Sequence, residues 1–497
     1  MLDKTLTDWK NAAAELTIES RAFIDGDYVD AASGETAVTL NPANGDPLAE
    51  VARCGAEDAD RAVASARQAF EDGRWADRPP AERKAVLVRW AELIEEHADE
   101  LALLESLDVG KPIADTTGVD VPSAVRTIRW SGEAIDKIYD EIAPTPKKTL
   151  ALVQRLPLGV VAAIVPWNFP LSTTAWKLAP SLATGNSVIL KPASNTPLTA
   201  LRIAGLAAEA GLPDGVLQVL PGPGGSLGKH LALHEDIDGL TFTGSTPVGK
   251  LLMQYSGQSN LKRTFLELGG KSPNIVFADA DLDRAAAMAA VAVFYNGGQT
   301  CTAGTRLIVQ DTIQEAFLEK VSAHAARWMP GDPLNPETRM GPMVDQGQHE
   351  TVADYVDIGR KEGAELCFGG GRVLEDTGGW YHEPSIFTGV NNTMRIAQEE
   401  IFGPVLSVIP FSDANEAIRI ANDSIYGLAG AVWSRDISTA HRVADAVRVG
   451  TMGVNNYFGG DITVPFGGFK QSGNGRDKSI HAFHDYTELK TTWIELD

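Results

Sequence analysis

The 497-residue sequence has only three cysteines, Cys54, Cys301 and Cys367. So sparse and odd a set argues against a disulfide-stabilised secreted protein and fits a reducing compartment, where a cysteine serves packing or chemistry. Long apolar runs are also missing, because the longest, Leu158–Trp167 and Ala285–Phe294, are each about half of the ~20 residues that a transmembrane helix needs. The N-terminus lacks a basic region followed by an apolar stretch, so we expect no signal peptide. These features predict a cytoplasmic protein.

Positive charge is scarce. The chain has 43 Lys and Arg against 66 Asp and Glu, a formal net charge of -23. Such a surface repels phosphate, so nucleic acid and anionic membranes are not expected partners. We find no internal repeat and no low-complexity linker. The length exceeds what one hydrophobic core usually serves, and two or three domains are therefore expected.

Hydrophobic periodicity divides the chain near residue 159. The first 140 residues are mostly helical in pattern, and the apolar spacing from Ala81 to Leu107 predicts one long helix. Beyond Gly159, short Val/Ile/Leu-rich runs alternate with helical segments such as Leu198–Ala210, the pattern of parallel strands buried on both faces. The expected strands are Val160–Val165, Ser187–Leu190, Val216–Leu220, Leu240–Thr243, Asn274–Phe277, Arg306–Val309, Val405–Pro410, Ala429–Trp433 and Thr451–Val454. They predict an α/β protein with two parallel-sheet units and a ligand cleft between them.

Several glycine-rich segments resemble phosphate or nucleophile loops without matching them. Gly222–Leu227 fails the last position of the dinucleotide fingerprint, and Gly244–Lys250 is followed by Leu251 where a P-loop needs a hydroxyl. Gly224–Gly228 has the spacing of a serine-hydrolase elbow around Ser226, but no HGGG-like loop accompanies it. Phe242–Ser245 ends a strand and opens a helix, where free N–H groups favour a phosphate. An ordinary strand–helix turn explains that segment equally well.

Three further segments carry candidate chemistry. Cys301 lies in a loop of Gly, Asn, Gln and Thr, where a cysteine has little apolar packing to do, and it becomes a nucleophile only if its thiolate is stabilised. Glu267 precedes two glycines between strands, and Asn168 lies between two aromatics and two prolines at a strand end. A carboxylate placed in a cleft and an oxyanion donor are the functional interpretations. A surface turn and a shaped loop are the structural ones.

In their order along the chain these segments resemble motifs of the aldehyde dehydrogenase superfamily. The motifs are Pro166–Pro170, Phe242–Ser245, Glu267–Lys271, Gly298–Cys301, Glu400–Pro404, Pro465–Gly468 and Lys470–Gly473. The resemblance covers essentially the whole chain and implies the fold of that family, with two Rossmann-like parallel-sheet domains plus a small β oligomerisation element. It implies an NAD(P)-binding domain of residues 1–135 and 157–266, a catalytic domain of residues 267–477, and an oligomerisation element of residues 136–156 and 478–497. A homodimer or homotetramer is expected.

The resemblance also implies the reaction. Cys301 would attack an aldehyde, the Asn168 amide and the Cys301 N–H would hold the oxyanion, and Glu267 would activate water against the thioester, with Lys177 auxiliary. The cofactor-binding residues it implies are Trp167, Lys191, Ser194, Gly244, Ser245, Gly249, Glu400 and Phe402. We predict no metal site.

Two positions depart from the family pattern. Ser194 stands where many NAD-preferring relatives have a glutamate that repels a 2′-phosphate, so we expect NADP to be accepted alongside NAD. Asp477 stands where some relatives have a second glutamate, and we expect no proton-relay role for it.

The runs Asn455–Asp461 and Gly473–Ser479 look most like the γ-glutamyl-γ-aminobutyraldehyde dehydrogenases of bacterial putrescine catabolism. We therefore expect a γ-glutamylamino-, guanidino- or amino-butyraldehyde as substrate. The residues proposed to contact it are Asp120, Trp130, Tyr457, Phe458, Asp461 and Phe466, although solvated carboxylates and plain core aromatics remain the alternatives. Succinate-semialdehyde or broad aliphatic aldehyde dehydrogenase is the rival activity, disfavoured because Asn455–Asp461 has no basic residue. A non-catalytic homologue, like the lens crystallins, is disfavoured because Asn168, Glu267 and Cys301 are all present.

Overall fold

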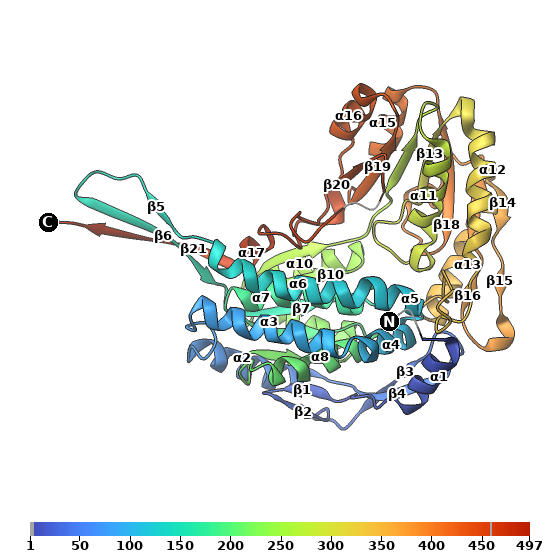
Figure 1. Ribbon diagram of the computed structural model, residues 1–497. Coiled ribbons are helices and arrows are strands. Elements are labelled where there is room, and N and C mark those ends of the chain that lie inside the picture. Colours follow the sequence, from blue (N-terminus) through green and yellow to red (C-terminus); the bar gives the residue numbers. More distant parts are fainter. Residues whose placement is uncertain (1–3, 458–459) are drawn as a thin grey trace.

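The computed structural model describes residues 4–457 and 460–497 and arranges them as two α/β lobes with a projecting arm (Figure 1). The first lobe contains a seven-stranded sheet in the order β11-β10-β7-β8-β9-β1-β2. Its strands are β1 Ala22–Ile24, β2 Asp27–Val29, β7 Val160–Ile164, β8 Ser187–Lys191, β9 Leu217–Val219, β10 Gly239–Thr243 and β11 Arg263–Glu267. From β7 the chain winds toward β8 and β9, and it then returns to β10 on the other side of β7. The loops after β7 and β10 therefore diverge and leave a crevice.

Helices cover both faces of this sheet because its central strands are buried throughout. One core cluster joins the sheet to α3, α4, α6, α7 and α8, and another joins it to α2, α9 and α10. These helices are α2 Ala56–Glu71, α3 Pro80–Glu96, α4 Ala98–Val109, α6 Val121–Ala134, α7 Pro170–Ala183, α8 Leu198–Glu209, α9 Lys229–Leu233 and α10 Thr246–Gln258. The short helices α1 Leu6–Glu15 and α5 Ile113–Asp115 and the hairpin β3 Thr36–Leu40 and β4 Pro47–Ala52 complete the N-terminal part.

The second lobe has a seven-stranded sheet in the order β14-β17-β18-β13-β12-β19-β20. Its strands are β12 Pro273–Val276, β13 Arg306–Gln310, β14 Glu365–Gly369, β17 Ser385–Thr388, β18 Val405–Phe411, β19 Ala429–Trp433 and β20 Thr451–Val454. All neighbours pair parallel except β14 and β17. Its helices are α11 Leu282–Phe294, α12 Gln314–Ala325, α13 Gln346–Lys361, α14 Arg395–Gln398, α15 Ala414–Asn422 and α16 Ile437–Ala446, with a small hairpin of β15 Arg372–Val373 and β16 Tyr381–His382. The two predicted parallel-sheet units and all nine predicted strands are thus present.

The helix predicted from Ala81 to Leu107 is wrong in one respect, because the chain breaks at His97 into α3 and α4. His97 has φ -101° and ψ 23°, outside the helical range. The break has a packing reason: α3 is buried along one face only, whereas α4 is buried on every side from Leu101 to Val109. One straight amphipathic helix cannot satisfy both environments. The N-terminal region is also less helical than predicted, since β1 to β4 lie there.

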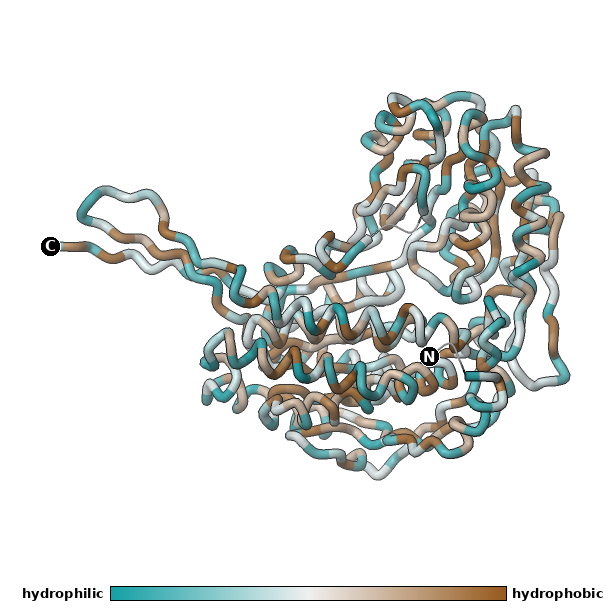
Figure 2. The backbone as a smooth tube through the Cα atoms, viewed as in Figure 1, coloured by the Kyte–Doolittle hydropathy of each residue, from teal (hydrophilic) through white to brown (hydrophobic). Residues whose placement is uncertain are grey.

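A three-stranded antiparallel sheet projects from the first lobe as an arm (Figure 1). The arm consists of β5 Glu141–Ala143, β6 Thr149–Pro157 and the C-terminal strand β21 Thr487–Glu495, with β6 in the centre, and the short α17 Ala482–Asp485 precedes β21. Figure 2 shows hydrophobic stretches along this arm although it stands clear of the body. Among the described residues, no helix combines the length and the apolarity needed to cross a membrane.

Candidate active site

A cavity of about 870 Å³ lies at the crevice between β7 and β10. The first lobe lines it with Val165–Phe169 after β7, Phe242–Ser245 at the end of β10, and Glu267 at the end of β11. The second lobe contributes Cys301 and Glu400–Phe402. The carboxyl ends of the strands therefore bring together the segments that the sequence singled out, although they are far apart along the chain.

The loop that carries Cys301 is held in a rigid shape. It follows α11 as the turn η4 Tyr295–Gly298, in which Asn296 and Gly297 have φ of 50° and 62°. Gly298 also has a positive φ, of 72°, and an added Cβ there would collide with the backbone of Gly403. The Gln299 side chain then anchors the loop, because its Oε1 accepts a hydrogen bond of 2.9 Å from the Val344 N–H. Glycine and asparagine are the residues that adopt such angles most readily, so the sequence Asn296-Gly297-Gly298 suits this turn.

Asn168 is bound to the same loop. Its side chain is 4% exposed, and its Nδ2 donates a hydrogen bond of 2.8 Å to the Gln299 carbonyl. In return the Asn296 Nδ2 donates to the Asn168 carbonyl at 3.1 Å. An amide nitrogen carries two N–H donors. The orientation of the amide is thus fixed by one donor while the other is left for a ligand in the cavity.

The Cys301 thiol is a neutral group in this environment. Desolvation raises its pKa to about 12, and the nearby Glu400 and Glu267 carboxylates act in the same direction. The N–H groups of Thr302 and of Cys301 itself oppose the shift. At neutral pH the thiol therefore needs a base, or an added positive charge, before it can act as a nucleophile.

Glu267 is buried without a neutralising partner. It is 2% exposed, and among the described residues neither carboxylate oxygen has a hydrogen-bond partner. Burial raises its pKa well above the usual range, Asp477 raises it further, and the Lys177 ammonium partly counteracts both. Lys177 and Asp477 themselves form a buried ion pair, with the Lys177 Nζ 2.7 Å from one carboxylate oxygen. Asp477, for which the sequence predicted no relay role, thus influences Glu267 electrostatically.

Glu400 is positioned by two consecutive glycines. Its Oε1 accepts a hydrogen bond of 2.9 Å from the Gly270 N–H. A Cβ on Gly269 would collide with the Glu400 carboxylate, and a Cβ on Gly270 with the Cys301 carbonyl oxygen. Desolvation raises the pKa of Glu400 to about 7, against the opposing effects of the Gly270 N–H and Lys271. The Glu267–Lys271 motif therefore fits between Glu400 and the Cys301 loop only because it contains these glycines.

The remaining predicted cofactor residues differ in their relation to the cavity. Trp167 and Phe402 line it and pack edge to face at 5.1 Å between ring centroids. Gly244 and Ser245 line it as well, and Ser245 is the N-cap of the 13-residue helix α10 with no side-chain cap bond. Lys191, Ser194 and Gly249 are not among the lining residues.

Each of these three has another contact. The buried Lys191 Nζ donates to the Pro192 carbonyl at 2.8 Å, and burial lowers its pKa to about 8. The exposed Ser194 hydroxyl donates to the Gly222 carbonyl at 3.0 Å. Gly249 allows α10 to pack closely on Leu268.

Some of the predicted substrate residues line the cavity and others do not. Asp120, Tyr457 and Phe466 line the cavity. Asp120 is fully buried at the end of the turn η1 Thr116–Asp120, which corrects the alternative of a solvated surface carboxylate. Tyr457 also supports the catalytic loop, since its hydroxyl donates to the Thr302 carbonyl at 2.7 Å.

Trp130 and Asp461 are not among the residues that line the cavity, and their role as substrate contacts stays a prediction. Trp130 packs on Phe483 at 6.0 Å between ring centroids, as part of the first-lobe core. Asp461 is exposed, and its Oδ1 accepts hydrogen bonds from the N–H and the hydroxyl of Thr463. Phe458 lies outside the described residues.

Sequence reasoning missed Trp176 and Lys478, which both line the cavity. Trp176 follows Ser172 and Thr173 by one helical turn on α7, and both of these also line it. That spacing was a signal that could have revealed Trp176. Lys478 lies in neither a helix nor a strand, so no sequence pattern predicts its position. Its contacts with residues distant in sequence bring it to the cavity.

Comparison with known proteins identifies the family. The model of the aldehyde dehydrogenase family matches residues 28–492. The chain is 52% identical over 493 residues to the NADP/NAD-dependent aldehyde dehydrogenase PuuC of Escherichia coli K12, covering 99% of each protein. It therefore belongs to the aldehyde dehydrogenase family, and the predicted activity, NAD(P)-dependent oxidation of aldehydes, is confirmed at the level of the family.

Solved structures agree. A mutant of the indole-3-acetaldehyde dehydrogenase AldA from P. syringae, in complex with NAD+ and IAA, matches with a TM-score of 0.98 and 59% identity, covering 99% of this chain and 100% of that one. The γ-glutamyl-γ-aminobutyraldehyde dehydrogenase from Burkholderia cenocepacia J2315 matches with a TM-score of 0.98 and 57% identity over the same shares. The predicted fold class is confirmed. The serine-hydrolase and NTPase alternatives receive no support, and Ser226 is exposed outside the cavity lining.

Proposed function

We propose that Cys301 is the nucleophile of this aldehyde dehydrogenase and that Asn168 and the Cys301 backbone N–H hold the oxyanion. The observation that carries the proposal is that Cys301, Asn168 and Glu267 line one cavity. The Cys301 thiol loses its proton to solvent water, and the thiolate sulfur then attacks the aldehyde carbon, which forms the C–S bond and places the carbonyl electron pair on oxygen. The second N–H of the Asn168 amide can donate to that oxygen, because its first donates to Gln299. Such a preorganised donor is typically worth ~2.7–4 kcal/mol in the transition state.

In our proposal Glu267 acts in the second half of the reaction, the hydrolysis of the thioester. A bound NAD(P)+ would supply the acceptor for the hydride of the substrate carbon, and loss of that hydride would convert the adduct on Cys301 into a thioester. The Glu267 carboxylate removes a proton from water, the oxygen attacks the thioester carbon, and the C–S bond breaks to release the acid. A buried carboxylate with a raised pKa is a strong proton acceptor once ionised, which suits this task.

The cofactor pocket fits both NAD and NADP in our proposal. The N-terminus of α10, with Gly244 and Ser245 at the cavity, offers free N–H groups for a pyrophosphate. Ser194 carries no charge that would repel a 2′-phosphate. We expect NADP efficiency to lie within a thousandfold of that for NAD, and Ser194→Glu to lower kcat/KM for NADP at least tenfold, about 1.4 kcal/mol, with NAD little affected. Steady-state kinetics with both cofactors tests this, and an unchanged NADP efficiency in the variant contradicts it.

The substrate in our proposal is a butyraldehyde with a nitrogen-bearing tail. The support lies around Asp120, which lines the cavity and pairs with the buried Lys111 at 2.9 Å. Glu105 and Asp115 lie close enough to interact electrostatically with Asp120, so three acids surround one lysine. Burial and Asp120 raise the pKa of Asp115 to about 7 and that of Glu105 to about 8. An arriving cation or N–H donor would stabilise their ionised forms, whereas an anion would not.

The test is cofactor reduction, followed by absorbance, with wild type beside Cys301→Ala. The panel contains γ-glutamyl-γ-aminobutyraldehyde, 4-guanidinobutyraldehyde, 4-aminobutyraldehyde, succinate semialdehyde, indole-3-acetaldehyde and propanal. We expect the nitrogen-bearing butyraldehydes to react fastest and every activity to vanish in Cys301→Ala. Faster oxidation of succinate semialdehyde or of indole-3-acetaldehyde would overturn the substrate, and activity retained in the variant would overturn the mechanism.

We also propose that the arm mediates homo-oligomer assembly, as a dimer or a tetramer, in the cytoplasm. Large apolar side chains on the arm are exposed: Ile142 is 72% exposed, Leu489 64% and Trp493 60%. An exposed apolar patch of this kind marks an interaction surface. The cytoplasmic location is supported by three cysteines that are all free.

A further inference from the structure

We infer that Lys478 binds a carboxylate on the distal end of the substrate. This inference rests on the proposed oxidation of a nitrogen-bearing aldehyde and names the other charge that the substrate carries. Lys478 lines the same cavity as Cys301, and its Nζ lies 5.4 Å from the ring centroid of Trp176. Trp176 in turn packs against Phe466, with 5.2 Å between the ring centroids, so the ammonium lies beside a pair of packed aromatic rings.

The backbone holds Lys478 at this place under strain. Lys478 and Ser479 have φ of 64° and 53°, angles that non-glycine residues adopt rarely. Backbone hydrogen bonds fix the segment on both sides: Asp477 exchanges two with Phe466, and the Ser479 N–H donates to the Ile462 carbonyl at 2.7 Å. Strained residues that their surroundings enforce cluster at ligand-binding sites.

The ammonium of Lys478 has no carboxylate partner among the described residues. Among the described residues no carboxylate lies within ion-pair distance of it, and the nearby Asp461 is engaged by Thr463. Desolvation lowers the pKa of Lys478, with Arg126 acting in the same direction and Asp461 and Asp477 opposing. A half-buried cation facing a cavity is stabilised by an anionic ligand.

Only some candidate substrates supply both charges. A γ-glutamylamino aldehyde ends in an α-carboxylate beside an α-ammonium and carries an amide N–H along its chain. Lys478 would take the carboxylate, while the acids around Asp120 suit the donor groups. Guanidino- and amino-butyraldehyde carry a cation but no carboxylate, so they have no group that would bind the Lys478 ammonium. The substrate loop Asn455–Asp461 has no basic residue, but Lys478 brings a positive charge to the cavity from outside that loop.

The test compares Lys478→Gln, Lys478→Arg and the control Lys361→Gln, an exposed lysine on α13. For γ-glutamyl-γ-aminobutyraldehyde we expect Lys478→Gln to raise KM at least tenfold, about 1.4 kcal/mol, with kcat nearly unchanged and with recovery in Lys478→Arg. For 4-guanidinobutyraldehyde KM should stay within twofold or fall. Equal losses on both aldehydes, or no loss on the first, would overturn the inference. Absence of turnover in the wild-type enzyme would instead refute the proposed function.

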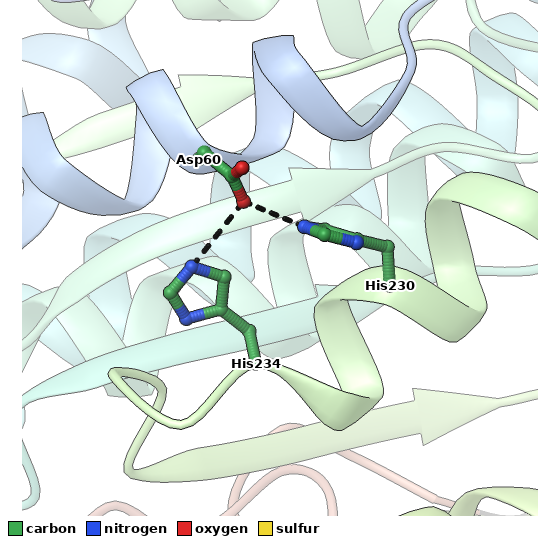
Figure 3. Close-up of side chains that lie close together, drawn as sticks. All are labelled: Asp60, His230 and His234. Atoms are coloured by element: carbon green, nitrogen blue, oxygen red, sulfur yellow. Dashed lines mark hydrogen bonds and ion pairs between the residues drawn. The ribbon is translucent and has the colours of Figure 1, made fainter.

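A second inference comes from an independent cluster on the first lobe, where the geometry points to a zinc site formed by Asp60, His230 and His234. Figure 3 shows the imidazoles of His230, on α9, and of His234, just after α9, facing the Asp60 carboxylate. The Asp60 Oδ1 lies 2.6 Å from the His230 Nε2 and 3.5 Å from the His234 Nε2. One potential ligand atom from each residue lies within 4.8 Å of the others.

The donor set and its placement suit Zn²⁺. His230 lies in α9, His234 follows the last residue of α9 with an extended backbone, and Asp60 comes from α2. Two imidazole nitrogens and one carboxylate oxygen form a tetrahedral zinc site when water takes the fourth position, whereas Mg²⁺ and Ca²⁺ prefer oxygen ligands. The short helix η3 Gly224–Gly228 leads directly into α9, and its glycines line the cavity. The cluster is therefore connected to the cavity through one continuous segment of the chain.

The test is calorimetric titration with Zn²⁺ in the Cys301→Ala protein, which removes the active-site thiol as a competing ligand. We expect one zinc per chain, binding at least tenfold weaker after His234→Gln or Asp60→Asn, and no change after His441→Gln, an exposed histidine on α16. Mg²⁺ should not bind at this site. Unchanged zinc affinity in the His234→Gln and Asp60→Asn proteins would overturn the assignment. Sulfur ligands detected by X-ray absorption spectroscopy at the zinc edge would overturn it as well.

Discussion

The buried ion pair of Lys177 and Asp477 offers a prediction that links stability to catalysis. Their side chains are 2% and 4% exposed, and the Nζ lies 2.9 and 2.7 Å from the two carboxylate oxygens. At an effective dielectric constant of ~20, charges about 3 Å apart attract by ~5.5 kcal/mol, partly offset by the cost of desolvation. Asp477→Asn leaves the ammonium buried without its counter-charge. We expect the free energy of unfolding to fall by ~3–5 kcal/mol.

Urea unfolding at one fixed protein concentration, followed by tryptophan fluorescence and by circular dichroism, measures this loss. The double variant Lys177→Met with Asp477→Leu removes both charges at similar volume, and we expect it to be as stable as wild type or more so. A loss below ~1 kcal/mol in Asp477→Asn, or a double variant as unstable as the sum of the single ones, would refute the reasoning.

The same substitutions should move the pKa of Glu267 in opposite directions. Asp477 raises that pKa and Lys177 lowers it. Removal of the Asp477 charge therefore lowers the pKa of Glu267, and removal of the Lys177 charge by Lys177→Met raises it. Because thioester hydrolysis needs the carboxylate, its acidic limb should shift to lower pH in Asp477→Asn and to higher pH in Lys177→Met. Single-turnover hydrolysis across pH measures the shifts, and shifts of the same sign would show that the effect is not electrostatic.

Three further predictions concern the thiol, a glycine and the arm. Because the pKa of Cys301 is about 12, its alkylation by iodoacetamide without cofactor should accelerate about tenfold per pH unit between pH 7 and 9; mass spectrometry of the modified peptide measures the rate, and a flat profile contradicts the burial argument. Gly269→Ala should displace the Glu400 carboxylate and lower kcat/KM, whereas Gly257→Ala, where an added Cβ meets nothing within 4 Å, should not, and equal kinetics in the two variants would contradict the fit. Trp493→Glu places a charge on a 60% exposed arm residue and should lower the oligomeric mass measured by light scattering; an unchanged mass would count against the arm as the interface.

Much of the fold could be predicted from the sequence because its central strands are short, apolar and buried on both faces. Such runs read as parallel strands wherever they occur. The break at His97 could not be predicted, because it follows from the complete burial of α4, which depends on neighbours remote in sequence. The short strands β1 and β2 were missed because each has only three residues, too few to show a periodic pattern, although they pair with each other.

The site was predictable in its parts but not in its assembly. Asn168 and Glu267 follow strands β7 and β11, and Cys301 precedes β13, so the chemistry-bearing residues could be recognised as strand-end segments. Nothing local shows that they meet, and the separation of 34 residues between Glu267 and Cys301 leaves this open. Lys478 lies beyond such reasoning altogether, because a pair of strained residues and distant backbone hydrogen bonds bring it to the cavity.

The electrostatics of the cavity lead to one further consequence. Cys301, Glu267 and Glu400 all have raised pKa values, and desolvation is the largest cause for each. Burial thus favours the neutral forms of these three groups. The oxidised nicotinamide ring carries a positive charge, and a positive charge placed among these groups lowers all three pKa values together. We therefore expect the Cys301 thiol to react faster when the oxidised cofactor is bound than when the cavity holds no cofactor.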